Sequence, residues 1–229
     1  MPSWRETPPR WPMTLLITLP IAAGFLLTLF VFYPGIMTYD ARYVYGAIAQ
    51  HRVGDWQSPA MTALWALIDP IAPGSASMFL LIATLYWLAF AVLAFVTAGH
   101  SRRLALALPL LALAPPALEF VGIIWRDILF ADVWLLAAAL AYAAAPRAGR
   151  VRGPMQALAL GLFVLGLLLR PNALFAAPIL GTYILSPSRW RRKFLALAYV
   201  PAALGLFALV QVIYYGVFDA ARQNPLHSI

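Results

Sequence analysis

The side chains that could do chemistry in this sequence are a few carboxylates, arginines and aromatic rings, which lie in three polar segments. In the first segment, residues 33–70, Asp40 opens a predicted short helix, and Asp55 and Trp56 lie in a loop flanked by Gly and Pro. Two later segments, near residues 119–132 and 169–172, carry the other candidates, which are Glu119, Trp125, Arg126, Asp127, Asp132, Arg170 and Asn172. Ionisable groups are costly in an apolar chain, so they usually mark function or a paired structural site.

Several kinds of reactive centre find no support in the sequence. The absence of cysteine excludes disulfides and thiolate metal sites, and His51, His100 and His227 have no ligand spacing. Neither a Ser–His pairing nor a dense acidic metal cluster is evident. We therefore expect no metal and no cofactor; a divalent ion is compatible with the sequence but not indicated by it.

The composition places these polar segments in a membrane protein. Of 229 residues, 63% are hydrophobic and 10% are charged, whereas soluble domains have about 45–50% apolar and about 25% charged residues. So few polar side chains could not cover the surface of a soluble domain, and we predict an integral membrane protein. The net charge of +8 has an explanation in membrane topology, and no nucleic-acid partner is expected.

The apolar runs predict where the chain crosses the bilayer. A crossing needs about 20 residues, and the runs 13–33 and 75–97 each supply one. The run 104–145 is long enough for two crossings and is interrupted by prolines and charges, which predicts a helical hairpin. The run 155–185 is split by Arg170-Pro171-Asn172 into two short helices, and 194–217 supplies the last span. The prediction is an all-α polytopic protein with about seven transmembrane helices.

The distribution of charge predicts the orientation of these spans. Eleven of the sixteen Lys and Arg fall in the N-terminal tail and in three loops on the same side, whereas seven of the eight acids fall on the other side. Basic loops are cytoplasmic. Residues 1–12 are therefore a predicted cytoplasmic tail, and 13–229 a single transmembrane domain. Its first outer loop, 34–74, is expected to carry short interfacial helices, one of them at 59–69.

Each polar candidate also has an explanation that involves no function. Asp40 could cap the helix that follows it, and Arg126 and Asp127 could simply pair with each other. Asp132 lies one turn inside a predicted span and needs a partner, for which the outer arginines are the available cations. Arg170 could extend from a helix end to the lipid headgroups.

Four polar phrases of the sequence resemble stretches of bacterial membrane glycosyltransferases with the GT-C fold, which use polyprenyl-phosphate sugars. The general layout is also similar: a cytoplasmic tail, one span, then a long outer loop with an Asp just after the membrane exit. The phrases are YPGIMTYD at 33–40, DWQSPAMTALW at 55–65, WRDILFAD at 125–132 and LRPNALFAAP at 169–178.

The resemblance implies a mechanism and assigns residues to it. In such enzymes the Asp of the first outer loop is the general base for an acceptor hydroxyl that displaces polyprenyl phosphate with inversion, and Asp40 takes that position. Arg126 and Arg170 would hold the donor phosphate, because guanidinium groups bind phosphate bidentately. Supporting polar or sugar-binding roles fall to Asp127, Asn172, Tyr39, Tyr43, Asp55, Trp56 and Asp132.

The implied function is transfer of a sugar to an extracytoplasmic lipid, glycan or protein at the inner membrane of a bacterium. The chain departs from the family pattern in having one acid, Asp40, where many members have a pair, and Gln57 where a His is common. Members usually have more spans, so we expect a chain that lacks C-terminal spans, as a truncated frame, half of a split enzyme or an inactive remnant. The alternative is a non-catalytic scaffold or transporter subunit of a glycan-export system, although acids clustered at one face favour surface chemistry over conduction.

Overall fold

The computed structural model describes residues 11–50, 52, 54–145, 152–185 and 199–222, and this part of the chain is almost entirely helical. Two strands of two residues each are the exception. In chain order the elements are α1 (Trp11–Phe32), β1 (Ile36–Met37), α2 (Tyr39–Ala49), α3 (Pro59–Ile68), η1 (Asp69–Ile71), α4 (Ser75–Thr97), α5 (Arg102–Ala112), α6 (Pro115–Val121), β2 (Ile123–Ile124), α7 (Arg126–Ala144), α8 (Arg152–Leu169), η3 (Pro171–Phe175), α9 (Ala177–Leu185), α11 (Tyr199–Val212) and η4 (Ile213–Val217).

Four helices of the described residues are long and apolar enough to cross a membrane: α1, α4, α7 and α8. The pair α5 and α6, bent by 55°, would be a fifth span if it crosses as one unit. α9 has 9 residues and α11 has 14, fewer than the length that a crossing normally needs. The all-α prediction is confirmed for this part of the chain, and the membrane prediction is supported by four or five of the seven expected spans.

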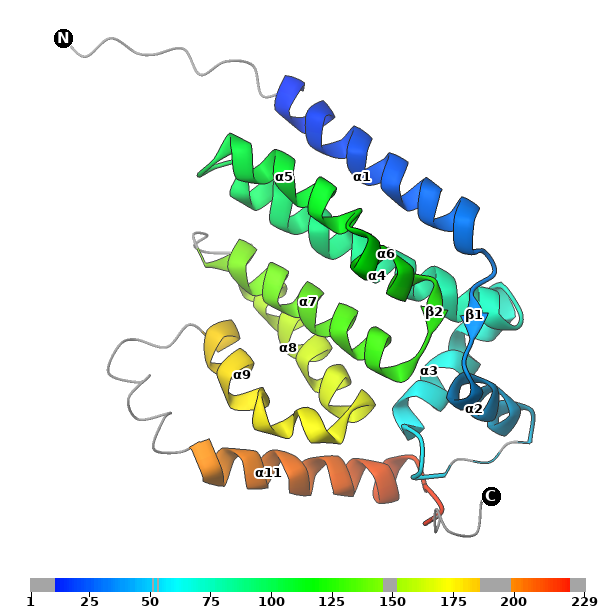
Figure 1. Cartoon of the computed structure of the whole chain (residues 1–229). Helices are drawn as coiled ribbons and strands as arrows, with labels where there is room; N and C mark the ends of the chain where they lie inside the picture. Colours follow the sequence, from blue (N-terminus) through cyan, green and yellow to red (C-terminus); the bar gives the residue numbers. More distant parts are fainter. Residues whose placement is uncertain (1–10, 51, 53, 146–151, 186–198, 223–229) are drawn as a thin grey trace, which may run out of the picture.

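The long helices lie side by side in antiparallel layers (Figure 1). Helices α1, α5 with α6, α8 and α11 run in one direction, and α4, α7 and α9 run in the other. The short elements β1, β2, α2 and α3 gather at one end of these layers, on the right in Figure 1. The polar segments lie at this end because each of them occupies a turn between two long helices.

Prolines create the breaks that the sequence predicts. Pro115 and Pro116 open α6 after α5 has ended at Ala112, and the chain bends between the two helices. Pro171 likewise opens η3 directly after α8. Proline has no backbone N–H to continue a helix and its ring collides with the preceding turn. Both apolar runs are therefore divided at the predicted points.

A two-residue parallel sheet ties the first polar segment to the second. Ile36 pairs with Ile123 and Met37 with Ile124, and the Ile36 N–H donates to the Gly122 carbonyl at 2.9 Å. A Cβ on Gly122 would collide with the ring of Phe32, so glycine is required for this approach. Segments distant in the sequence are held together here by backbone hydrogen bonds.

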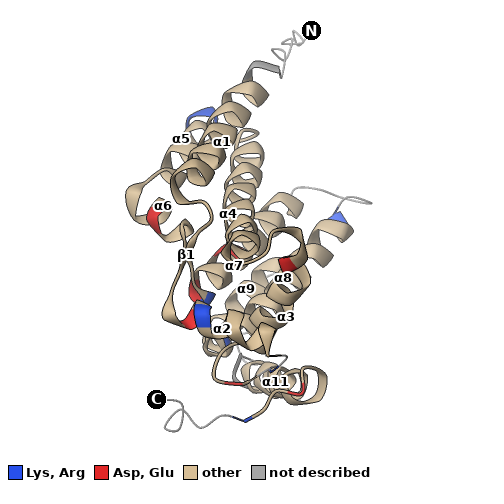
Figure 2. Cartoon of the chain, turned by 90° about the vertical axis from the view of Figure 1, so that its right-hand side faces the viewer, with Lys and Arg blue, Asp and Glu red and all other residues tan. Residues whose placement is uncertain are grey.

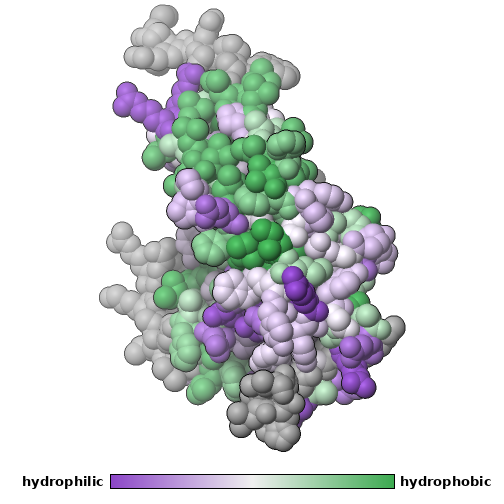
Figure 3. Space-filling model, turned by 45° about the vertical axis from the view of Figure 1, so that its right-hand side comes forward, coloured by the Kyte–Doolittle hydropathy of each residue, from purple (hydrophilic) through white to green (hydrophobic). Residues whose placement is uncertain are grey.

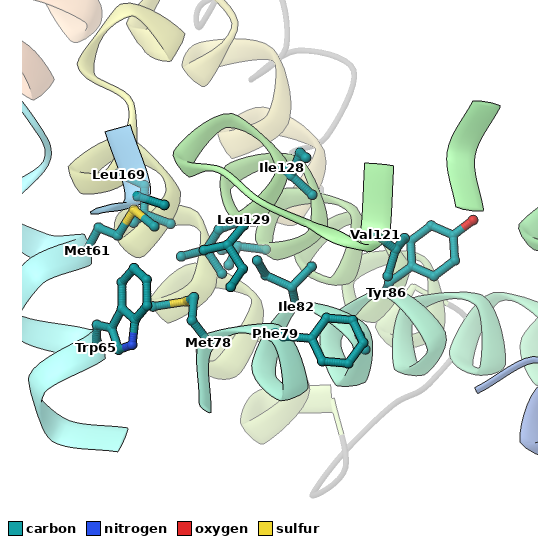
Figure 4. Close-up of a cluster of buried hydrophobic side chains, with 14 of the residues drawn as sticks. Met61, Trp65, Met78, Phe79, Ile82, Tyr86, Val121, Ile128, Leu129 and Leu169 are labelled. Carbon is teal, nitrogen blue, oxygen red and sulfur yellow. The ribbon is translucent and has the colours of Figure 1, made fainter. Parts of the chain in front are cut away.

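A hydrophobic core lies next to these short elements (Figure 4). Trp65 of α3 is fully buried, and its indole N–H donates to the Gly74 carbonyl at 3.1 Å. Met78 and Phe79 of α4, and Leu129 of α7, complete its centre. α3, the helix expected at the membrane interface, thus packs one face into this core and leaves Leu67 exposed on the other.

The outer surface of the long helices is apolar. In Figure 3 hydrophobic side chains cover the upper part of the face, over α1 and α5, and hydrophilic side chains gather below them. On α1, 65% of Leu19 and 88% of Phe30 is exposed. Exposed apolar surface on this scale indicates contact with lipid or with a partner and is not typical of a surface in water.

Candidate functional site

A polar cavity of about 240 Å³ lies where the three polar segments meet. Its walls come from the first segment, from the start of α7, from the end of α8 and from the last helical turns of the described chain. The lining residues are Asp55, Trp56, Gln57, Ser58, Arg126, Arg170, Pro171, Asn172 and Tyr214. Figure 2 shows acidic and basic segments close together at this end of the molecule, beside α2 and β1. The predicted convergence of the three segments is therefore seen in the structure.

One carboxylate holds both arginines of the cavity. Asp127, in the first turn of α7, has its Oδ1 atom 3.7 Å from Nε of Arg126, and the same oxygen forms an ion pair with Nη1 of Arg170. These side chains are only 25–34% exposed. With Asp55 in the same wall, two guanidinium groups face two carboxylates, so the formal charges at this site balance and the guanidinium N–H groups are its charged donors.

Two polar atoms of the cavity wall have no hydrogen-bond partner among the described residues. They are Nε of Arg126, a donor, and Oε1 of Gln57, an acceptor, and both are buried. Leaving such a group unsatisfied costs about 1–3 kcal/mol, so buried polar groups nearly always have a partner in native proteins. Nε of Arg126 still lies in the 3.7 Å ion pair with Asp127, so among the described residues of the cavity wall Oε1 of Gln57 is the group left without either kind of partner.

Two hydroxyl groups in the cavity wall form hydrogen bonds to the end of α8. Because α8 stops at Leu169, no later N–H of the helix donates to the carbonyl of Leu168. Ser58 Oγ donates to that carbonyl at 2.8 Å, and Tyr214 Oη donates to it as well. Ser58 also caps α3 by accepting from the Met61 N–H at 3.2 Å. One serine therefore joins α3 to α8 at the edge of the cavity.

The last described segment holds Asp55 in place. Tyr215 Oη donates to Asp55 Oδ2 at 2.8 Å, and the Asp55 N–H donates to the Ala221 carbonyl at 3.1 Å. The guanidinium of Arg222 lies 5.0 Å from the centre of the Tyr215 ring, a distance typical of a cation–π contact. The first polar segment is thus anchored by residues more than one hundred positions later in the chain.

Asp40 is not among the residues that line the cavity. It sits in the first turn of α2, and the cap is Thr38, whose Oγ1 accepts from the Ala41 N–H at 3.1 Å. The same hydroxyl donates to the Ile124 carbonyl, two residues before Arg126. The alternative explanation of Asp40 as a helix cap is therefore wrong.

The aromatic candidates are divided between the cavity and the surface. Trp56 lines the cavity and packs edge-to-face on Tyr43, with 5.1 Å between ring centres. Tyr43 itself does not line the cavity, and Tyr39 is 71% exposed. Of the predicted aromatic residues, Trp56 is the one that lines this cavity.

Asp132 does not pair with an arginine as the sequence analysis expects. Only 5% of the residue is exposed, and its Oδ2 has no hydrogen-bond partner within the described chain. The two ion pairs found there both use Asp127, which lies one and a half turns nearer the start of α7 and takes both cations. Asp132 faces a different cavity instead.

Four lining residues were not singled out for a role in the cavity: Gln57, Ser58, Pro171 and Tyr214. The first two directly follow Trp56, so their place in the same loop was the available signal. Tyr214 sits in an apolar run and gave no signal. No group of three or more His, Cys, Asp or Glu that could hold a metal ion is found in the described ranges.

No family model, curated protein or solved structure matches this chain. The chemistry of the cavity must therefore indicate the function. Its wall offers two guanidinium groups, one carboxylate, two amides, two hydroxyls and one indole ring. This set suits a ligand that combines an anionic group with hydroxyl groups.

Proposed function

We propose that this chain is a membrane-embedded glycosyltransferase that moves a sugar from a polyprenyl-phosphate donor to an extracytoplasmic acceptor. The observation that carries the proposal is the cavity in which Arg126 and Arg170, from separate segments, lie with the carboxylate of Asp55. Such a site offers what the reaction needs, namely cations for a phosphate leaving group and a base for an attacking hydroxyl.

The two arginines are proposed to bind the donor phosphate. Asp127 orients both guanidinium groups before a ligand arrives, which lowers the conformational entropy lost on binding. Both guanidinium groups line the cavity, and their N–H groups are proposed to donate to the phosphate oxygens. When the anomeric C–O bond breaks, negative charge builds on that phosphate, and fixed donors stabilise it in a poorly hydrated site.

The geometry favours Asp55 over Asp40 as the general base. A base must lie within hydrogen-bond reach of the proton that it removes, directly or through one water, and Asp55 lines the cavity whereas Asp40 does not. The acceptor hydroxyl gives its proton to the carboxylate, its oxygen forms the new bond to the anomeric carbon, and polyprenyl phosphate leaves with the electron pair. Asp40 stays the prediction from the family resemblance, and the two assignments are separable by mutation.

The sugar is proposed to lie between the amides and the indole ring. Gln57 Oε1 is buried and unpartnered, and Asn172 lies on the same wall, so both are suited to hydrogen-bond hydroxyl groups. Trp56 offers a flat apolar face of the kind on which a pyranose stacks. A cavity of about 240 Å³ holds the headgroup, with the polyprenyl chain outside it among the helices.

The proposed setting is the plasma membrane of a bacterium, with the cavity on the outer side. This arrangement needs seven crossings, in which α5 with α6, η3 with α9, and α11 with η4 each cross as one unit beside the four long helices. The antiparallel course of these elements supports it, as does the excess of basic residues in the segments that the sequence predicts to be cytoplasmic. The GT-C resemblance of the four polar phrases is consistent with this orientation.

The decisive experiment uses the full chain in vesicles of bacterial lipid extract. Polyprenyl-phosphate glucose and polyprenyl-phosphate arabinose are added, and released polyprenyl phosphate and labelled products are followed. We expect turnover with one donor and loss of turnover in Arg170→Ala, with Arg103→Ala unaffected, because Arg103 is exposed at the opposite end of the molecule. Donor binding without turnover in the parent contradicts the transferase proposal and favours the scaffold alternative.

A further inference from the structure

A second cavity lies between α4, α6 and α7, and the proposed reaction does not use it. Its volume is about 320 Å³. It is lined by Tyr86, Ala117, Phe120, Val121, Trp125, Asp127, Ile128, Ala131 and Asp132. The wall thus combines aromatic rings and small apolar side chains with two carboxylates, and it contains no Lys or Arg.

The carboxylate of Asp132 is the feature that needs an explanation. Asp132 is 5% exposed, its Oδ2 is unpartnered among the described residues, and it lines this cavity. The hydroxyl of Tyr86 is not available to it, because that group donates to the Ala112 carbonyl at 2.6 Å. A buried carboxylate without a partner is costly, so the site calls for a cation or a hydrogen-bond donor.

The surrounding groups favour an organic cation. Asp127 is already neutralised by two arginines, which leaves Asp132 as the free acid of the cavity and gives too few ligands for a metal ion. The rings of Tyr86, Phe120 and Trp125 line the same space, and aromatic faces attract ammonium groups. A carboxylate among aromatic rings is the usual chemistry of an amine site.

The position of the cavity indicates that the amine is carried by an apolar molecule. Asp132 lies six residues into α7, about 9 Å along a helix at 1.5 Å per residue. Phe120 and Trp125, which are 52% and 37% exposed, form the outer edge of the cavity. An apolar chain could leave past them into the hydrocarbon.

We propose that this cavity binds a primary ammonium group attached to an apolar chain, with Asp132 as its counter-ion. The chemistry is shared by an amine-bearing lipid such as phosphatidylethanolamine and by a free long-chain amine. This proposal does not rest on the transferase proposal, because its key residue does not line the polar cavity.

The test measures binding of decylamine to the full chain in neutral detergent, with decanol as the uncharged probe of equal length. We expect the amine to bind about tenfold more tightly than the alcohol, and Asp132→Asn to remove that difference. Glu119→Gln is the matched control, because it also removes one acidic charge but lies exposed on α6 outside the cavity. Equal binding of amine and alcohol, or a preference retained in Asp132→Asn, overturns the proposal.

A second variant keeps the test valid if Asp132→Asn does not fold. Ala131 is exposed at the edge of the cavity, and Ala131→Phe should block entry and abolish amine binding while the carboxylate stays. Amine binding that persists in a folded Ala131→Phe variant contradicts the proposed location. Phosphatidylethanolamine is then added as competitor: displacement of decylamine identifies a lipid as the source of the amine, and no displacement identifies a free amine.

Discussion

Arg170 forms an ion pair with Asp127, although Arg170 directly follows the end of α8 and Asp127 lies in the first turn of α7. The contact joins two polar segments that the sequence separates by a full helical hairpin. It also brings Arg170 next to Arg126, which pairs with the same carboxylate oxygen. Two guanidinium groups would repel each other at this separation, and the shared carboxylate makes their proximity stable.

Loss of either arginine should weaken binding of the donor phosphate. Hydrogen bonds to charged groups contribute about 1.5–3 kcal/mol, so Arg170→Ala and Arg126→Ala should each raise the Kd for polyprenyl phosphate by about 10- to 100-fold. Titration of the reconstituted chain with polyprenyl phosphate measures this. A Kd that equals that of Arg103→Ala removes the arginine from the phosphate site.

The variants Asp55→Asn and Asp40→Asn should separate the two assignments of the general base. A positioned base contributes about 10²- to 10⁴-fold to rate, and we expect that loss in kcat for Asp55→Asn, with little change in donor affinity. For Asp40→Asn we expect a kcat within a few-fold of the parent. The reverse result would return the role to Asp40. Tyr215→Phe, which removes one hydrogen bond to Asp55, should have a smaller effect of the same kind.

Ser58→Ala should destabilise the fold. The hydroxyl caps α3 and bonds the Leu168 carbonyl, and Ser58 is 1% exposed, so its loss should lower the free energy of unfolding by about 1–3 kcal/mol. Ser101→Ala is the control, because Ser101 caps α5 through a longer, exposed contact of 3.4 Å. Thermal unfolding in detergent measures both variants, and equal losses would show that the bond to α8 contributes little.

Two glycines of α8 should respond oppositely to alanine. A Cβ on Gly166 would collide with the indole of Trp134, which is held by a hydrogen bond to the Phe163 carbonyl at 3.1 Å, so Gly166→Ala should destabilise by about 1–3 kcal/mol. Gly161 has open space around its Cβ position. Gly161→Ala should be neutral or stabilising by up to about 1 kcal/mol, since alanine favours helix. A stable Gly166→Ala variant would mean that α7 and α8 separate easily.

The sequence was most informative about elements whose causes are local. Ser75–Thr97 is a helix with the predicted bounds, and the breaks at Pro115 and at Pro171 fall where expected. An apolar run long enough to cross the hydrocarbon favours a helix over its own residues, and a proline breaks a helix at its own position. Both effects can therefore be predicted without a tertiary structure. The convergence of the three polar segments also follows from the order of helices and turns. In a series of antiparallel helices, every second turn lies at the same end of the molecule.

What the sequence by itself determined is that a helical, apolar chain brings its three polar segments to one end of the molecule, where it predicts Asp40 beside Arg126 and Arg170. The tertiary structure decided which groups face one another. It places Asp55 in the cavity wall and Asp40 outside it, adds Tyr214 from an apolar run, and leaves Asp132 without a cation among the described residues. The physical reason is that side-chain direction and pairing depend on helix rotation and packing, which are set by contacts between residues far apart in the chain.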